Sequence, residues 1–434
     1  MYLCPIPAGA VLQRPCLTHP LSWRESGWFS IGNRRAIIVI ALIVCLISTG
    51  CWGRHEIEKL GFVLVAGLDI EKSQHMLVTV QIAKPFTIAG GFARPMAEER
   101  SFWLISSSGT TVFEAIRGFF KQSPRRLFWG HNRFIIIGED LARQGVHQAL
   151  DVFDREGEPR RREEILVAKG KRASEVMESE FELERLPLEG FEGISENVRQ
   201  GLSTSLVISQ LEFKRALEGE GIEPIASGVV LVRRPVPVKE IRGYLKDDII
   251  SYSASYDGAA AFRGDRLVGW LNAKQTRGLN WIRNRAQGGA IVIKRPHHPE
   301  EKESMTIEVI RASSEITPHF KNGQPVVDVR VRVEGDMVES QKYIDPLNDS
   351  TWKVLNRELS DKVKDEVESA IAQAQSLNTD ILGFGRAFYC DQPQAWYGGL
   401  KQTWYDIFPN LTVQITVESK LRRTGLLVRT LTSH

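Results

Sequence analysis

Cysteine and long apolar runs are both scarce in this chain of 434 residues. The five cysteines are Cys4, Cys16, Cys45, Cys51 and Cys390. After Cys51 no segment has the ~18 consecutive apolar residues of a membrane-spanning helix. The formal net charge is only +3, so the composition gives no electrostatic argument for nucleic-acid binding.

The common signatures of nucleotide binding and catalysis are also missing. The segment 169–171 (KGK) lacks the upstream glycine and the following Ser or Thr of a phosphate-binding loop. The segment 383–388 (GFGRAF) has two of the three glycines of a dinucleotide fingerprint, but it follows a predicted helix and not a strand. No G-x-S-x-G elbow exists, and Cys390 has no histidine near it in sequence. These absences favour a binding or assembly protein over an enzyme.

Candidate metal ligands and paired carboxylates give equally weak signals. The histidine pair at 297–298 lies between two prolines, so its imidazoles diverge in a turn, and we predict a solvated loop there. The aspartates at 247–248 point to opposite faces of any strand, which is the wrong geometry for a shared acid/base task. The arginines at 160–162 precede Glu163 and Glu164, and we interpret this run as a solvated start of a helix or strand.

The N-terminal region contains a short apolar segment that ends in a cysteine. Two arginines precede the apolar residues 36–47, and the small residues 48–50 lead to Cys51. About a dozen apolar residues fit the central region of a signal peptide, roughly 7–15 residues, and fall short of the ~20 that span a bilayer. A cysteine directly after such a cleavage site is the lipid acceptor of bacterial lipoproteins. We therefore predict a signal peptide over residues 1–50 and lipidation at Cys51. The alternative interpretation of 36–47 is a buried core segment.

Two features of this region bear on processing and stability. Ser48 stands three positions before the cysteine, where lipoprotein signals usually have Leu. The sequence leaves open whether translation begins at Met1 or nearer Ile31. If Cys51 is acylated, Cys390 stands alone and the mature chain has no intramolecular disulfide, so its stability must come from the size of its core.

Hydrophobic periodicity predicts a mixed α/β region after the signal. The β-rich runs 61–69 and 76–82 indicate an antiparallel hairpin. Thr111 begins a capping box and hence a helix. The run 133–138 (RFIIIG) is a short buried strand, after which Asp140 caps a helix that continues through the 150s.

The middle of the chain shows a boundary followed by short elements. Residues 189–205 are rich in Gly, Ser and Asn with weak periodicity, which indicates a domain boundary. A helix over 205–217 and a strand over 225–232 follow. The strands 259–262 and 266–270 form a hairpin around a glycine-containing turn.

The last third has the clearest pattern. The alternating runs 305–316 and 326–338 enclose a strong hairpin signal. A helix is predicted over 350–376 because its apolar residues recur every three or four positions, and a strand follows at 411–417. The predicted fold class is therefore α+β or mixed α/β, with antiparallel-rich sheets packed by helices. Three mixed domains are expected after the lipoprotein signal: 51–200, 201–290 and 291–434.

Several local patterns together resemble the Ger(x)C family, the C-subunit lipoproteins of spore nutrient germinant receptors. The segment 51–57 (CWGRHEI) is similar to the family's CWDRREI start, with Gly53 in place of the usual Asp. Further similar runs follow in family order at 130–132, 135–139, 258–262, 267–271, 276–278 and 380–385. The similarity extends over nearly all of the chain after Cys51.

The resemblance implies a non-catalytic, lipid-anchored subunit of a membrane complex that senses nutrients in dormant spores. The implied partners are a multi-spanning B subunit related to amino-acid transporters and an A subunit, with no nucleic acid. Residence on the outer face of the inner membrane is implied as well. The resemblance further implies three mixed α/β domains without catalytic residues, cofactor or metal. Under it, the cluster Trp396, Trp404, Phe408 and Pro409 is core packing of the last domain.

A second function remains open on the sequence, namely a substrate-binding lipoprotein of a membrane transporter. Such a protein captures its ligand in a cleft with convergent polar groups. An interaction protein needs an exposed apolar or aromatic patch instead. The two functions are therefore distinguished by the kind of surface that the fold displays.

Overall fold

The computed structural model describes most of the chain after position 56. The described residues are 57–85, 100–155, 157–159, 161–234, 251–294, 304–340 and 349–422, together with position 38. Lipidation at Cys51, the histidine pair at 297–298 and the aspartate pair at 247–248 lie outside these residues and stay predictions.

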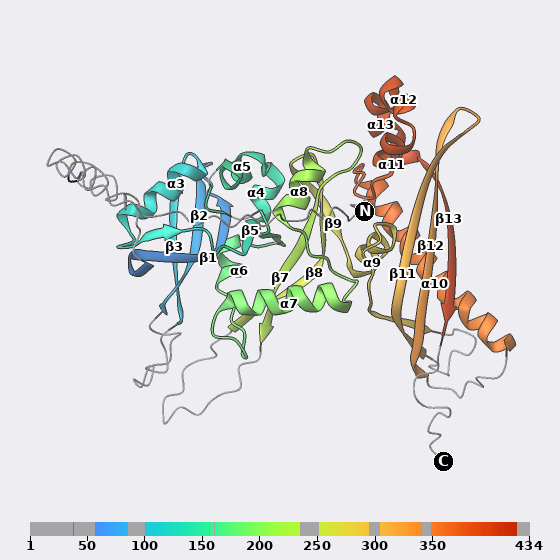
Figure 1. Cartoon of the computed structure of the whole chain (residues 1–434), viewed down its shortest axis with the longest axis horizontal. Coiled ribbons are helices and arrows are strands. Elements are labelled where there is room, and N and C mark those ends of the chain that lie inside the picture. The colour runs from blue at the N-terminus through green and yellow to red at the C-terminus, as the bar shows by residue number, and fades with distance from the viewer. Residues whose placement is uncertain are drawn as a thin grey trace, which may run out of the picture. The chain divides into compact units, whose positions relative to one another are not determined.

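The described strands form two sheets with helices packed against them (Figure 1). The first sheet has the order β3-β2-β1-β5-β6-β7-β8-β9, with β4 beside β1. Its strands are β1 (Leu60–Ile70), β2 (Met76–Ala83), β3 (Phe102–Gly109), β4 (Arg126–Phe128), β5 (Phe134–Gly138), β6 (Glu164–Ala168), β7 (Ile225–Arg234), β8 (Ser251–Arg263) and β9 (Arg266–Leu271). The second sheet has the order β10 (Ala290–Lys294), β11 (Ser304–Lys321), β12 (Gln324–Ser340) and β13 (Thr412–Leu421). The molecule therefore has the mixed α+β fold class that the sequence predicts.

The helices are distributed along the whole described chain. In chain order the α-helices are α3 (Val112–Gly118), α4 (Glu139–Gln144), α5 (His147–Arg155), α6 (Ala173–Met177), α7 (Pro187–Gly201), α8 (Gln210–Leu217), α9 (Ala273–Ile282), α10 (Asp349–Ser376), α11 (Phe384–Asp391), α12 (Pro393–Ala395) and α13 (Lys401–Ile407). Short helical turns are η1 (Ile57–Lys59), η2 (Phe119–Lys121), η3 (Trp396–Leu400) and η4 (Phe408–Asn410).

The central strands of the first sheet are buried on both faces. Every residue of β5 and β6 is buried, as expected of parallel strands that are covered on both sides. Ile135 and Ile137 share one core with α4 and α5, whereas Phe134 and Ile136 share another with α6 and α7. Because successive side chains of a strand point to opposite faces, the apolar run of β5 fills both cores.

The three predicted hairpins are confirmed. The pairs β1–β2, β8–β9 and β11–β12 are antiparallel and are joined by short turns. In the turn between β11 and β12, Asn322 and Gly323 have φ values of 53° and 75°. Asn and Gly tolerate this left-handed region best, so the Asn-Gly pair fixes the register of the longest hairpin in the described chain.

The prediction of one helix after β5, capped by Asp140, is wrong in two respects: the capping residue differs and the helix is interrupted. Gly138, and not Asp140, occupies the N-cap of α4, and the helix ends at Gly145 before α5 begins. Gly145 has a φ of 132°, and a Cβ atom there would lie 2.6 Å from an Asp265 carboxylate oxygen. Backbone conformation and close approach together interrupt the apolar periodicity, so two short helices replace one long one.

The weakly periodic segment 189–205 is a helix and not a linker. It lies mostly within α7, which has a proline in its first turn. Gly190 lowers the helical signal in the sequence, but it lets the ring of Phe181 pack against the helix backbone. The next helix begins at Gln210 behind a Ser209 cap, later than predicted. The segments 51–200 and 201–290 both contribute strands to the first sheet. Within this sheet, β6 of the first segment pairs with β7 of the second. The three-domain division stays a prediction.

The C-terminal elements are close to the sequence prediction. Along β12, Val327, Val329, Val331 and Val333 are buried while the residues between them are more exposed. The long helix α10 lies against β13 (Figure 1) and buries one face of apolar residues, Leu355, Leu359, Val363, Val367 and Ile371. The sheet and helix thus form the layered arrangement expected from their periodicities.

This arrangement predicts the effect of a charge on the buried face of α10. Val363 is 0% exposed, so Val363→Asp places a carboxylate without a partner in the core and should destabilise the protein by several kcal/mol. The matched change Lys364→Asp, at an exposed position, should cost less than about 1 kcal/mol. Urea unfolding of both variants checks this, and equal unfolding midpoints would show that the helix face is assigned wrongly.

Candidate functional site

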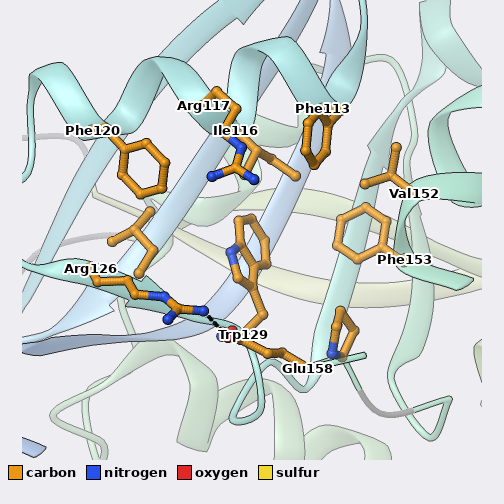
Figure 2. Close-up of a pocket in the computed structure, with 11 residues that line it drawn as sticks. Phe113, Ile116, Arg117, Phe120, Arg126, Trp129, Val152, Phe153 and Glu158 are labelled. Carbon is orange, nitrogen blue, oxygen red and sulfur yellow. Dashed lines mark hydrogen bonds and ion pairs between the residues drawn. The ribbon is translucent and has the colours of Figure 1, made fainter. Parts of the chain in front are cut away.

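A small apolar pocket opens beside helix α3. Helix α3 and turn η2 contribute Phe113, Ile116, Arg117 and Phe120, and the other walls come from β4, Trp129, α5 and the Glu158-Pro159 segment (Figure 2). The four residues of α3 and η2 lie at relative positions i, i+3, i+4 and i+7 and therefore share one helix face. The Thr111 hydroxyl fixes the start of this helix by accepting a hydrogen bond from the amide of Glu114 at 3.2 Å, as the capping box predicts.

The rim of the pocket is aromatic and exposed. Phe113 is 41% exposed and Phe120 is 54% exposed. They lie on either side of Arg117, whose guanidinium carbon is 4.9 Å and 5.2 Å from the two ring centroids (Figure 2). Cation–π contacts of this kind hold the three side chains in a preformed arrangement. We refer to Phe113, Arg117 and Phe120 as the aromatic rim.

The floor of the pocket is held by ring packing and by an ion pair. The rings of Trp129 and Phe153 are both buried and pack edge to face with centroids 5.8 Å apart. Glu158 accepts a hydrogen bond from Nη2 of Arg126 at 2.6 Å and another from the backbone amide of Trp129 at 3.2 Å. Glu158, the only carboxylate among the described residues of the lining, is therefore already paired.

The chemistry of the pocket suits recognition and not catalysis. Its volume is about 110 Å³, which accommodates one apolar side chain. Among the lining residues that the structure describes, no histidine, cysteine or hydroxyl side chain is present to serve as a nucleophile or general base. Exposed aromatic groups around a preformed apolar pocket are typical of contacts with another protein.

The motif residues 380–385 build a buried turn and not a nucleotide site. Asp380 is buried, and Oδ1 accepts hydrogen bonds from the amides of Gly383 (2.8 Å) and Phe384 (3.1 Å). Oδ2 accepts from the amide of Gly385 (2.6 Å) and from Nε1 of Trp404 (3.1 Å). Burial raises the pKa of Asp380, the four hydrogen bonds lower it, and the effect of burial is larger, so the pKa is about 6. The carboxylate thus caps α11 and holds the C-terminal aromatic cluster.

That aromatic cluster is core packing, as predicted. Trp396, Trp404 and Phe408 are each less than 5% exposed, and Pro409 is partly buried. The rings of Trp396 and Trp404 pack edge to face with centroids 5.6 Å apart.

A second motif, residues 276–278, joins two helices through a buried carboxylate. Glu366 of α10 is 0% exposed and accepts a hydrogen bond from Nε of Arg277 at 2.8 Å, while Nη2 of the same arginine contacts its other oxygen. Nε1 of Trp281 donates to Glu366 at 3.0 Å. A Cβ atom on Gly278 would lie 2.0 Å from the Glu366 carbonyl oxygen, so only glycine fits where the helices cross. This motif too is architectural.

The solvated interpretation of Glu163 and Glu164 is wrong, because both side chains are buried. Glu163 is 1% exposed and has one hydrogen bond, from Nδ2 of Asn132 at 2.8 Å. Glu164 accepts a hydrogen bond from Ser195 at 2.5 Å and contacts Arg199. Burial raises the pKa of Glu163 to about 8, so this carboxyl is mostly protonated at neutral pH. The partners are 31 or more residues away, and no local pattern could have revealed them.

The remaining candidates from the sequence show no assembled site among the described residues. Cys390 is exposed and free. Within the described ranges, no three His, Cys, Asp or Glu residues are grouped to hold a metal ion. In the same part of the chain, no helix has the length and apolarity to cross a membrane.

Comparison with known proteins places this chain among spore germination proteins. A family model described as the spore germination protein N-terminal domain matches residues 53–231, and one described as spore germination B3/GerAC like, C-terminal, matches 257–425. Spore germination protein KC of Bacillus subtilis (strain 168) is 24% identical over 90% of this chain and 96% of its own length. Spore germination protein B3 of the same organism is 23% identical over 89% and 97%. The solved structure of the GerBC protein is similar with a TM-score of 0.49 and 19% identity, over 82% of this chain and 96% of that chain.

The burial of Glu163 predicts a pH dependence of stability. Its pKa is about 8 in the folded chain and near 4.5 when unfolded, so its stabilising contribution is complete below about pH 4.5 and is lost as the pH rises through 8. Glu163→Gln cannot ionise, so its stability relative to wild type should rise across this window by a few kcal/mol.

Chemical unfolding of wild type and Glu163→Gln at several pH values between 4.5 and 9 measures this difference. Glu192→Gln, at a partly exposed glutamate of α7, is the matched control, and its stability should follow that of wild type over this pH range. Parallel stability profiles for Glu163→Gln and wild type would contradict the assignment of a protonated buried carboxyl.

Proposed function

The chain belongs to the Ger(x)C family of spore germination proteins, and we propose that it is the non-catalytic, lipid-anchored subunit of a germinant receptor complex. The two family models together match residues 53–231 and 257–425. Relatives with the printed names spore germination protein A3, B3 and KC support a place in germination. The A and B subunits of such a receptor are the proposed partners.

The aromatic rim is the observation that carries the assembly part of this proposal. Phe113 and Phe120 expose apolar surface next to a preformed pocket, and Arg117 between them supplies a fixed positive charge. Such a surface fits an apolar side chain of a partner flanked by an acidic group. The motif residues Asp380 and Arg277 support a non-catalytic role, because their polar atoms serve the fold.

The proposed anchor keeps this surface near the bilayer. Lipidation at Cys51 leaves nine residues before β1 begins at Leu60. A fully extended segment of that length spans at most about 30 Å. A lipid on Cys51, palmitate for example, therefore tethers the first sheet close to the outer face of the inner membrane, within reach of membrane-embedded partners.

The alternative function is ligand capture for a membrane transporter. It is favoured by one observation, a larger pocket lined by convergent arginines between α8, α9, β11 and α11. A receptor subunit can contain such a pocket too, so the aromatic rim is the surface on which the two functions differ.

The lipid anchor predicts the behaviour of two cysteine variants. Two or more acyl chains make anchoring stable, since burial contributes roughly 0.8 kcal/mol per CH₂. Cys51→Ala should therefore carry no lipid and either retain the signal or escape to the soluble fraction. Cys390→Ala, at the exposed free thiol, should remain anchored.

Detergent phase partition and intact mass in a Gram-positive host measure both properties. A wild-type mass without acyl groups, or a mature N-terminus other than Cys51, would contradict the proposal that the chain is a lipoprotein.

The aromatic rim predicts a loss of assembly without a loss of folding. Phe113→Ser with Phe120→Ser removes two exposed apolar anchors, so co-purification of the A and B subunits from spore membranes should fall at least about tenfold, with slower nutrient-triggered germination. The melting temperature should change little because both rings are exposed. Leu183→Ser, at a residue that is 94% exposed and far along the chain, is the control and should behave as wild type. Full assembly by the double variant would show that the chain docks on the A and B subunits through a surface other than the aromatic rim.

A further inference from the structure

A second and larger pocket lies where helices α8, α9 and α11 meet strand β11. Its volume is about 470 Å³, within the range of sites for small molecules. Part of its wall is apolar and comes from Ile208, Phe213, Ile222, Ile225, Ile282, Ile316 and Leu382. The described charged residues of its lining are four arginines and one carboxylate, namely Arg215, Arg283, Arg285, Arg386 and Glu212. We refer to it as the arginine pocket.

Arg283 is a partly buried cation of the arginine pocket, and no described residue forms an ion pair with it. Its Nη1 atom is buried and has no hydrogen-bond partner among the described residues. Burial and the neighbouring Arg285 lower the pKa of Arg283 to about 10, which leaves the guanidinium charged at neutral pH. The end of α9 lies at Arg283, and the helix dipole favours a cation there, but this effect is weaker than the cost of partly burying a charge without a partner.

The carboxylate of the lining does not neutralise Arg283. Glu212 is paired with Nη2 of Arg285, and Nη1 of Arg285 donates to the Val207 carbonyl at 3.3 Å. Asp380 acts on Arg283 only at a distance, because its two oxygens already accept four hydrogen bonds. Positive charge in the pocket therefore remains uncompensated by the lining.

Two further donors converge on the same space. The hydroxyl of Ser314, on β11, is buried and has no partner among the described residues. Arg386, in the first turn of α11, and Arg215, on α8, are exposed residues of the pocket lining. No ion pair joins either arginine to a carboxylate within the described part of the chain. Guanidinium groups and a hydroxyl are the donors that bind carboxylate and phosphate oxygens.

We propose that the arginine pocket binds a small organic anion. A carboxylate or phosphate group contacts Arg283 and Ser314, with Arg386 and Arg215 at the rim, and an apolar body packs on the isoleucine and phenylalanine wall. The inference is independent of the proposed receptor function and of the lipid anchor. Because the walls come from α8 near the first sheet and from β11 of the second, a bound anion ties together elements of both sheets and stabilises the folded chain.

Thermal shift and isothermal calorimetry on the purified full chain test this proposal. The probes are 4-methylpentanoate, phenyl phosphate and inorganic phosphate, with 4-methylpentanamide as the uncharged match. We expect the organic anions to raise the melting temperature and to bind at least tenfold more tightly than the amide. A preference for phenyl phosphate or for 4-methylpentanoate identifies the headgroup. Equal shifts with the acid and the amide would overturn the proposal.

Two variants assign the binding to this pocket. Arg283→Met should weaken anion binding at least tenfold and raise the melting temperature of the unliganded chain, whereas a merely structural arginine would lower it. Arg386→Met, at an exposed position, should weaken binding at least threefold without altering the unliganded melt, which keeps the test valid if Arg283→Met fails to fold. Arg100→Met, at an exposed arginine that pairs with Glu180, is the control and should bind as wild type. Unchanged affinity in Arg386→Met together with unchanged affinity or misfolding in Arg283→Met counts against the site.

Discussion

The buried ion pair between Arg277 and Glu366 holds together the two halves of this fold. Arg277 lies on α9, which directly follows the last strand of the first sheet, and Glu366 lies on α10, which packs against the second sheet. The carboxylate is inaccessible to solvent, so losing its arginine would leave it only the Trp281 hydrogen bond and Lys362 at 3.9 Å, at a cost of several kcal/mol. Gly278 lets the two helix backbones approach closely enough for this contact. Other contacts, such as the hydrogen bond from the Thr379 hydroxyl to the Phe262 carbonyl, support the same junction.

Three buried carboxyl groups of the chain serve its architecture. Asp380 caps a helix, Glu366 joins two helices, and Glu163 is a neutral hydrogen-bonding group at physiological pH. The two pockets differ in kind, because one offers exposed rings for a protein contact and the other offers arginines for an anion. A subunit that docks on partners through one surface and binds a small ligand at another can couple the two events. A ligand that stabilises one arrangement of the sheets changes the population of the conformation to which the partner binds.

The sequence predicts the local elements well and the contacts between them poorly. The hairpin at Asn322 and the helix α10 are readable because turn chemistry and periodicity are local signals. The Arg277–Glu366 pair joins positions 89 residues apart, and no local pattern marks it. Likewise, the face of α3 that presents the aromatic rim is visible in the spacing of its residues, whereas the floor of that pocket comes from α5 and is not. The arginine pocket combines four arginines from three separate segments of the chain, so only the fold reveals it.

Hydrogen–deuterium exchange on the assembled complex tests most directly the claim that this chain is a receptor subunit that docks through α3. The complex would be isolated from spore membranes in mild detergent and compared with the free chain. We expect amides of residues 112–129 to exchange more slowly in the complex, while amides in the buried middle of α10 stay unchanged. A chain that elutes without partners, or a complex in which residues 112–129 exchange as they do in the free chain, would contradict it.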